Sequence, residues 1–528
     1  MNKPAFFFCA TTNTYGAIVL AAVLSGCGGD SSDDQGPTVA QLAATCASMV
    51  GKVIAGATVT AATRIEPVAN ISTAGFCKVN ATRAPFLDIE VDVPDNWSGR
   101  YWQNGGGGFN GTIPSAVSTS ASGVITALNP ALAQKAAVYA ASNGGNRASV
   151  PAEAAPAVWA NGTANGAASA TDYDYLSVGT TLAVAKGVIA AFYGTPAKYR
   201  YFNGCSNGGR EAYIAAQRWP DDFDGIVSGC ETEDMTGQTA AWLDLGRRAG
   251  TAAAPTAAQY RAAYAAAVAS CDAQDGLTDA YLENPAACNY DPGLLLCGLP
   301  TANADPALCL TAPQVQTLKD LMSPLKLADG TVVYAGFTWS DFSTFGPSFG
   351  VLGSGFALLA TNDASWLTPT KQATFNVDAH YALIGNGLRR VGAEHDLPAI
   401  ASFVASGKKL ISWHDAGDNL LSTREHARND VMLTQLIKNL GVADPTTNTR
   451  LFAVPSSTHS AGSALTQVDW ATAIMNWVEQ GTAPTQLTYT FTPAGAAAAR
   501  NLPVCLYPKY PRYNGTGDVN AAANYTCT

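Results

Sequence analysis

The feature that most constrains this chain is a serine between glycines where a strand gives way to a helix. Residues 199–205 form an aromatic-rich run with strand character, and residues 211–219 are rich in helix formers. Between them, Gly204 and Gly208 flank Ser206. In a chain with 50 glycines this spacing also fits a plain Gly-rich turn. Its strand–turn–helix setting instead predicts a nucleophile elbow, a strained turn that lifts a serine hydroxyl above a sheet.

Strand and helix patterns alternate on both sides of this turn. The strand-like segments are 86–94, 97–103, 136–142, 224–230, 408–413 and 450–454, and the helix-like segments are 173–193, 396–406, 424–440 and 470–479. We expect the first two strands to be partners. The alternation predicts a mostly parallel sheet with helices on both faces. Together with the elbow, it predicts the α/β-hydrolase fold.

The alternation stops between residues 231 and 375. This stretch has four cysteines, several prolines and alanine-rich helical segments, which favours an inserted lid domain. With 528 residues the chain exceeds one ordinary domain. The predicted division is 1–36 for a signal and tether, 37–230 for the first part of the core, 231–375 for the lid and 376–528 for the second part of the core.

The N-terminus carries a targeting signal. An apolar run, residues 17–24, leads into Leu24-Ser25-Gly26-Cys27, which fits a lipobox with Cys27 as the lipidated residue. The alternative is an ordinary cleaved signal with an incidental cysteine. Either predicts export, as an outer-membrane-anchored lipoprotein or as a periplasmic or extracellular protein. We expect no later segment to span a membrane, and the net charge of −10 argues against nucleic acid as a partner.

Twelve cysteines fit an oxidising compartment. With Cys9 and Cys27 set aside, ten remain, an even number that suggests five disulfides whose connectivity the sequence does not fix. Pairing by proximity in sequence gives Cys46–Cys77, Cys271–Cys288, Cys297–Cys309 and Cys505–Cys527, and leaves Cys205 with Cys230. The absence of a Cys-x-x-Cys motif argues against a zinc or redox site.

A serine hydroxyl needs a base, and the base needs a carboxylate to hold its tautomer. His459 follows the last core strand and Asp418 follows the strand before it, in the order Ser–Asp–His of α/β-hydrolases. Asp415 is closer to its strand end and ranks second as the acid. The remaining histidines have other expected places: His414 and His426 as local structural or rim residues, His380 and His395 as solvated or capping residues.

A glycine cluster, residues 104–111, follows the strand-like segment at 97–103. Bare backbone N–H groups there can approach a substrate carbonyl, so we expect one from residues 106–108, with Gly107 as the choice, to join the N–H of Asn207 in an oxyanion hole. A phosphate-binding loop is disfavoured because no Gly-Lys-Ser/Thr follows. A merely flexible loop remains an alternative.

Within the predicted lid, Asp272, Asp275 and Asp279 surround Gly276. Three carboxylates with intervening carbonyls can wrap a hard cation. The spacing is not that of an EF-hand, and a solvated acidic turn next to a disulfide fits the pattern equally well.

These motifs together resemble the tannases and feruloyl esterases, a family that includes bacterial mono-hydroxyethyl terephthalate hydrolases. The resemblance runs from about Cys46 to the C-terminus. It is carried by the glycine loop at 104–111, Gly-Cys-Ser-Asn-Gly-Gly-Arg-Glu at 204–211, Asp-Gly-Ile-Val at 224–227, the Asp-rich loop, His414-x-x-x-Asp418, and Val454-Pro455 ahead of His459.

The resemblance implies a nucleophile, Ser206, an orienting acid, Asp418, and a base, His459. It also implies structural calcium, held by the side chains of Asp272, Asp275 and Asp279 and the carbonyls of Leu277 and Tyr281. No organic cofactor is expected.

One position departs from the family. There, a cysteine beside the nucleophile is bridged to a cysteine directly after the catalytic histidine, whereas this chain has Ser460. Cys205 must pair elsewhere or stay free. Cys230 ends the strand expected beside the elbow strand, so we predict a Cys205–Cys230 bridge.

The resulting prediction is an exported serine carboxylesterase that acts through an acyl-enzyme on esters of phenolic or related aromatic acids, of feruloyl, galloyl or terephthaloyl type. An acyltransferase or peptidase with the same triad, and a non-catalytic surface binding lipoprotein, are the alternatives. Five lid aromatics are candidates either for the acyl pocket or for the core: Trp339, Phe342, Phe345, Phe349 and Trp366.

Overall fold

The computed structural model describes residues 36–67, 72, 74–119, 125–127, 129–493 and 496–528. Residues 38–528 form one compact unit. Cys9 and Cys27 lie outside the described residues, so the signal and the lipidation of Cys27 stay predictions.

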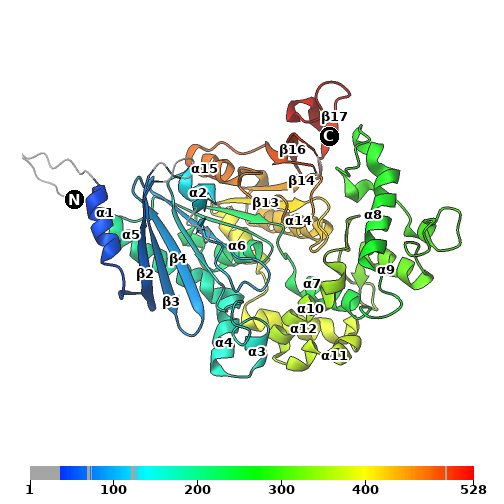
Figure 1. Ribbon diagram of the computed structural model, residues 1–528, viewed down its shortest axis with the longest axis horizontal. Helices are drawn as coiled ribbons and strands as arrows, with labels where there is room; N and C mark the ends of the chain where they lie inside the picture. Colours follow the sequence, from blue (N-terminus) through cyan, green and yellow to red (C-terminus); the bar gives the residue numbers. More distant parts are fainter. Residues whose placement is uncertain (1–35, 68–71, 73, 120–124, 128, 494–495) are drawn as a thin grey trace, which may run out of the picture. The chain divides into compact units, whose positions relative to one another are not determined.

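A twelve-stranded sheet organises this unit (Figure 1). In spatial order its strands are β1 (Val53–Ile54), β2 (Ala57–Ile65), β3 (Phe76–Arg83), β4 (Leu87–Pro94), β8 (Val138–Ser142), β5 (Arg100–Asn104), β9 (Tyr199–Cys205), β10 (Gly225–Gly229), β13 (Lys409–Asp415), β14 (Thr449–Val454), β16 (Arg500–Leu506) and β15 (Gln486–Phe491). The run from β8 to β14 is parallel, and the strands on either flank pair antiparallel. The predicted α/β-hydrolase fold is confirmed.

One predicted strand pairing is wrong. Strands β4 and β5 are consecutive in the chain, but β8 lies between them, antiparallel to β4 and parallel to β5. In chain order β5 is the first strand of the parallel run, and the chain then crosses over to β8, which adds parallel to β5 and separates it from β4.

Helices cover both faces of the sheet. Those packed with one face are α1 (Val39–Ala47), α5 (Ser177–Tyr193), α6 (Asn207–Arg218), α13 (Leu397–Ala405) and α14 (Thr423–Asn439). Those packed with the other are α2 (Pro130–Ala133) and α15 (Trp470–Gln480). Each helix-like segment of the sequence therefore corresponds to a helix of the core.

A long apolar helical run corrects one expectation. Helix α4 (Ala164–Thr171), a turn of π-helix (Asp172–Leu176) and α5 together span Ala164–Tyr193, which is long and apolar enough to cross a membrane by length and composition. Its apolar side chains, including Leu182, Val188 and Phe192, are buried in the core that α5 shares with the sheet. Apolar residues at those positions are what a helix covering a sheet requires.

Between β10 and β13 the described chain adds no strand to the large sheet. Before α13, its α-helices and strands are α7 (Met235–Gly246), α8 (Ala257–Cys271), α9 (Ala312–Met322), the hairpin β11 (Leu325–Lys326) and β12 (Val332–Tyr334), α10 (Phe349–Thr361), α11 (Pro369–Ala373) and α12 (Val377–Val391). Most of them pack in a second hydrophobic core, which also includes Trp159, Tyr173 and Leu421. The boundaries of the lid stay a prediction.

The small elements complete the fold: β6 (Val117–Thr119) with β7 (Ile125–Ala127), α3 (Ala157–Ala160), and β17 (Pro511–Tyr513) with β18 (Tyr525–Cys527). Five disulfides join Cys46–Cys77, Cys205–Cys230, Cys271–Cys288, Cys297–Cys309 and Cys505–Cys527. These are the pairs that the sequence suggested. The second of them ties the elbow strand to its neighbour.

Candidate active site

Ser206 occupies a strained turn between β9 and α6. Its backbone has φ 62° and ψ −125°, a conformation that non-glycine residues rarely adopt. A Cβ on Gly204 would lie 2.2 Å from the carbonyl oxygen of Gly208, and one on Gly208 would lie 2.6 Å from the carbonyl oxygen of Gly106. The turn is therefore closed to larger residues on both sides of the serine, as an elbow requires.

Three strand ends bring the predicted triad together. Strands β9, β13 and β14 belong to the parallel run, so their carboxyl ends lie at one edge of the sheet. Ser206 follows β9, Asp418 follows β13 by three residues, and His459 lies in the loop after β14. This is the sheet edge at which open α/β folds place their sites.

The side-chain distances join the three residues in a chain. His459 Nε2 lies 3.0 Å from Ser206 Oγ, and His459 Nδ1 lies 2.8 Å from Asp418 Oδ2. An ionised carboxylate only accepts, so Nδ1 carries the proton and Nε2 is left to accept the serine hydroxyl. The geometry is that of a serine activated by an imidazole that a carboxylate orients.

Asp418 is held as an anion. It is 1% exposed, and its Oδ1 accepts hydrogen bonds from the N–H groups of Leu420 and Leu421, each at 2.8 Å. Burial by itself would raise the pKa of Asp418, but the neighbouring imidazoles of His459 and His414 outweigh burial and hold that pKa below its usual range.

Asp415, the second-ranked acid, does not face the imidazole nitrogens. Its Oδ1 accepts a hydrogen bond from the N–H of Gly462 at 3.0 Å. Burial, with the nearby charge of Asp418, raises the pKa of Asp415 to about 7. The structure thus places Asp418, rather than Asp415, at His459.

A buried glutamate fixes the glycine loop against the elbow helix. Glu211 on α6 accepts from the N–H of Gly106 at 3.0 Å and from Nδ2 of Asn110 at 2.8 Å. Gly106 is thereby occupied, while Gly107 is exposed at the cavity wall. Asn207 begins α6, where an N–H has no partner within the helix. Sequence reasoning gave no function to Glu211; it noted the residue only as part of the family motif.

A cavity of about 570 Å³ opens over the serine. Its apolar wall is formed by Tyr139, Phe345, Leu352, Trp413, Leu420 and Leu465, and its polar groups include Asn104, Ser115, Asn129, Asn203 and Ser463. Among the described residues that line it there is no lysine or arginine. The cavity is large enough for an aromatic acyl group and offers it uncharged hydrogen-bonding partners.

One of the five lid aromatics reaches this cavity. The ring of Phe345 meets the ring of His459 edge-on, with centroids 5.8 Å apart. The other four, Trp339, Phe342, Phe349 and Trp366, are at most 3% exposed and belong to the core of the lid region.

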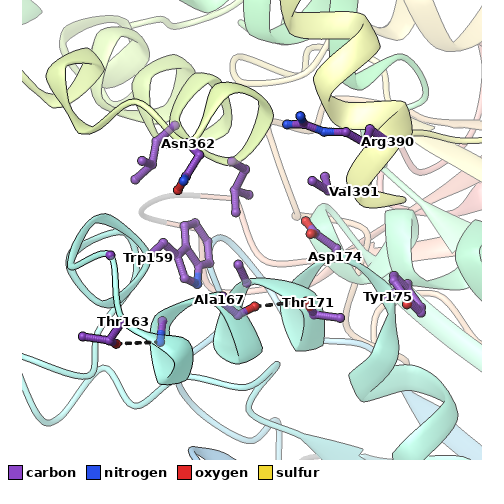
Figure 2. Close-up of a pocket in the computed structure, with 14 residues that line it drawn as sticks. Trp159, Thr163, Ala167, Thr171, Asp174, Tyr175, Asn362, Arg390 and Val391 are labelled. Carbon is purple, nitrogen blue, oxygen red and sulfur yellow. Dashed lines mark hydrogen bonds between the residues drawn. The ribbon is translucent and has the colours of Figure 1, made fainter.

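A second cavity, of about 440 Å³, lies between the α3–α4 region and helices α10 and α12 (Figure 2). Trp159, Asp174 and Arg390 are among its lining residues, and none of the triad residues is. Burial raises the pKa of Asp174 to about 8. This cavity is separate from the one over Ser206.

The Asp-rich loop presents buried anionic oxygens. Oδ1 of Asp272 and Oδ2 of Asp275 are buried and accept no hydrogen bond from any described residue. Burial raises the pKa of Asp275 to about 6 and that of the neighbouring Glu283 to about 8. Arg500 lies 2.6 Å from Asp279 and supplies one positive charge. The unpaired carboxylate oxygens fit a further hard cation.

The four histidines outside the proposed triad lie in different surroundings. His414 and His426 are each 1% exposed, so neither lies at a rim. His380 contacts the carbonyl oxygen of Asn376 at the start of α12, as expected of a capping residue. His395 is partly buried, its Nδ1 lies 3.2 Å from the carbonyl oxygen of Glu233, and burial lowers its pKa to about 3.

The fold and the site define a hydrolase of the α/β-hydrolase class, with a serine, an imidazole and a carboxylate aligned at the sheet edge. Residues 71–348 and 368–528 match the family described as tannase and feruloyl esterase. The chain belongs to this family and is an esterase.

Similar proteins span nearly the whole chain. A probable feruloyl esterase of Arthroderma benhamiae is 28% identical over 86% of each chain. A mono(2-hydroxyethyl) terephthalate hydrolase of Piscinibacter sakaiensis is 28% identical over 84% of this chain and 81% of its own. The crystal structure of feruloyl esterase B from Aspergillus oryzae has a TM-score of 0.76 at 22% identity, covering 92% of this chain and 100% of that one. Tannin acyl hydrolase from Aspergillus niger has a TM-score of 0.67 at 18% identity, covering 94% and 96%.

Proposed function

We propose that this protein is an exported serine carboxylesterase in which Ser206 is the nucleophile, His459 the base and Asp418 the orienting acid. The observation that carries the proposal is the continuous contact from Ser206 Oγ through His459 to Asp418, at 3.0 and 2.8 Å, with Ser206 and His459 lining a cavity.

The reaction follows from these positions. Ser206 Oγ attacks the ester carbonyl while its proton passes to His459 Nε2, and the N–H groups of Asn207 and Gly107 face the resulting oxyanion. The tetrahedral intermediate expels the alcohol, which takes the proton from His459. Water then attacks the acyl-enzyme, with His459 as its base, and the acid leaves as Ser206 regains its proton.

The cavity supports an uncharged aromatic acyl group. Phe345, Trp413 and Tyr139 offer ring contacts, and Asn104 and Asn129 can hydrogen-bond phenolic hydroxyls. A terephthalate monoester carries a carboxylate, and no described lining residue would neutralise it. A buried, unpaired charge is unfavourable. Feruloyl and galloyl esters are therefore preferred over terephthaloyl monoesters.

We also propose that calcium binds the side chains of Asp272, Asp275 and Asp279 with the carbonyls of Leu277 and Tyr281. The support is the pair of buried carboxylate oxygens that find no protein donor. Bound calcium would neutralise repelling carboxylates and stabilise the loop. It takes no part in the ester chemistry.

Export is consistent with five disulfides, which persist in oxidising compartments. We propose an anchor on Cys27. Metabolic labelling with a tagged fatty acid should mark the native chain and not the Cys27→Ala variant. Labelling that survives this substitution would exclude the anchor at that residue.

An ester panel tests the function. Methyl ferulate, methyl gallate, mono(2-hydroxyethyl) terephthalate and a peptide anilide are compared on the native protein and on Ser206→Ala. We expect turnover of the first two, weak turnover of the third and none of the anilide, with all turnover lost in the variant. A fluorophosphonate should label only the native serine. Anilide cleavage would favour the peptidase alternative, and absent labelling the binding-protein alternative. Acyl transfer to an added alcohol in preference to water would favour an acyltransferase.

A further inference from the structure

A second histidine touches the proposed orienting acid. His414, near the end of β13, places Nε2 3.2 Å from Asp418 Oδ2, the same oxygen that faces His459. On its other side, His414 Nδ1 lies 2.8 Å from Nδ1 of His426 on α14. The proposed triad therefore continues inward as an unbroken row of side chains.

Two glutamates enclose this histidine pair. Glu233 Oε1 lies 3.3 Å from Nδ1 of His414 and 3.0 Å from Nδ1 of His426. Glu231 Oε1 lies 3.1 Å from Nε2 of His426. None of the four side chains is more than 2% exposed. Water cannot screen these charges, so the charges must balance within the cluster.

The geometry of the two rings indicates a shared proton. Their planes are 79° apart and their centroids 5.1 Å apart, while the Nδ1 atoms are 2.8 Å apart. The centroid separation exceeds the Nδ1–Nδ1 separation by the sum of the two centroid-to-nitrogen distances. The two centroids and the two nitrogens therefore lie on one line, and each Nδ1 points directly at the other. Two lone pairs that bound one metal ion would converge on a third point instead. A linear N–H···N contact needs one proton between the rings.

The proton belongs to His414. Burial by itself would lower the pKa of His414, but Asp418 and Glu233 outweigh burial and raise that pKa well above its usual range. Burial lowers the pKa of His426 to about 4, which leaves that ring neutral. The titratable and charged groups around the pair are Asp415, Asp418 and His459 at the sheet edge, Glu231 and Glu233 after β10, Asp430 on α14, Tyr213 on α6 and Tyr334 on β12.

We infer that His414 is a positioning residue of the proposed hydrolysis, a buried imidazolium that keeps Asp418 ionised and holds its Oδ2 toward His459. The inference rests on the proposed function. Removing this buried positive charge makes protonation of the neighbouring Asp418 and His459 more favourable. The acid limb of kcat/KM then moves to higher pH by about one unit.

The test compares His414→Gln with His380→Gln. The first keeps a hydrogen-bond donor near Asp418 and removes the charge, whereas the second makes the same substitution in the first turn of α12, away from the proposed triad. We expect the acid limb to rise by about one pH unit in His414→Gln, so that the rate below the limb falls about tenfold, with KM unchanged. His380→Gln should keep the native profile. A native profile for His414→Gln would overturn the inference.

A second measurement does not depend on activity or on the folding of His414→Gln. The chain has five histidines, so labelling histidine with ¹⁵N leaves only five imidazole rings to assign. In the Ser206→Ala protein we expect one buried histidine to stay doubly protonated at pH 8, and through-bond correlation with the assigned backbone should identify it as His414. Neutral nitrogen shifts for His414 at pH 8 would overturn the inference. If Ser206→Ala kept its esterase activity, the proposed function would fail while this charge measurement still stood.

Discussion

Replacing Asp418 by asparagine tests the orientation of the imidazole. Two backbone donors, the N–H groups of Leu420 and Leu421, point at Oδ1 of Asp418 from 2.8 Å. The asparagine must therefore keep its oxygen there and turn its NH₂ group toward His459. An NH₂ group donates to Nδ1, so the proton of His459 moves to Nε2, the nitrogen that must accept the proton of Ser206.

This wrong tautomer sets the size of the effect. A triad that loses its carboxylate in this way slows by about 10³- to 10⁴-fold in kcat, or roughly 4–5.5 kcal/mol of transition-state stabilisation. The assay is steady-state hydrolysis of methyl ferulate, with Asp415→Asn as the matched control. Asp415 is as deeply buried but accepts from Gly462, so its variant should keep kcat within tenfold, about 1.4 kcal/mol. If Asp418→Asn kept more than a tenth of native kcat, or if both variants lost activity equally, the reasoning would be refuted.

Three further predictions concern stability. Cys205→Ser with Cys230→Ser opens a bridge across 25 residues and should lower the free energy of unfolding in urea by about 3 kcal/mol, so an unchanged midpoint would contradict a bridge at the elbow. Calcium at a hundred times its Kd should add about 2.7 kcal/mol to that free energy relative to EGTA, and Asp275→Asn should remove the difference; an equal response of both proteins would exclude this loop. Because the pKa of Asp415 rises from 3.8 to about 7 on folding, the folded chain retains a proton that the unfolded chain releases. The stabilisation by the protonated Asp415 carboxyl is thus full below pH 3.8 and is lost as the pH rises through 7. An asparagine does not titrate, so Asp415→Asn should gain stability relative to the native protein from pH 4 to pH 8. A constant difference across that range would refute the assignment.

The sequence predicts the elements that obey local rules. The elbow is visible because a strained serine requires glycines beside it, and the parallel run is visible because its strands and helices alternate. His459 and Asp418 are found because each follows a strand whose end lies at the same sheet edge. The position of β8 is not found, since the order of strands depends on crossovers and not on any one strand's pattern.

Side-chain direction is the part that sequence alone does not give. Asp415 ends β13 and Asp418 lies three residues beyond it, and only the path of the loop decides which of them meets His459. Phe345 reaches the cavity while Trp366 is buried, although both are aromatics of the same predicted lid. Glu211 follows the elbow in a helix pattern that does not show which way its carboxylate points.

Glu211 has a consequence for how such an esterase can diversify. Glu211 belongs to the elbow helix and accepts hydrogen bonds from the glycine loop, so it links two segments about a hundred residues apart in the chain. These two linked segments carry the serine and the proposed oxyanion donors. Phe345 and Leu352, contributed by the region beyond β10, shape the other side of the cavity. Substitutions at Phe345 and Leu352 can therefore change the preferred acyl group, while the linked serine turn and glycine loop, and with them the hydrolytic step, stay unchanged.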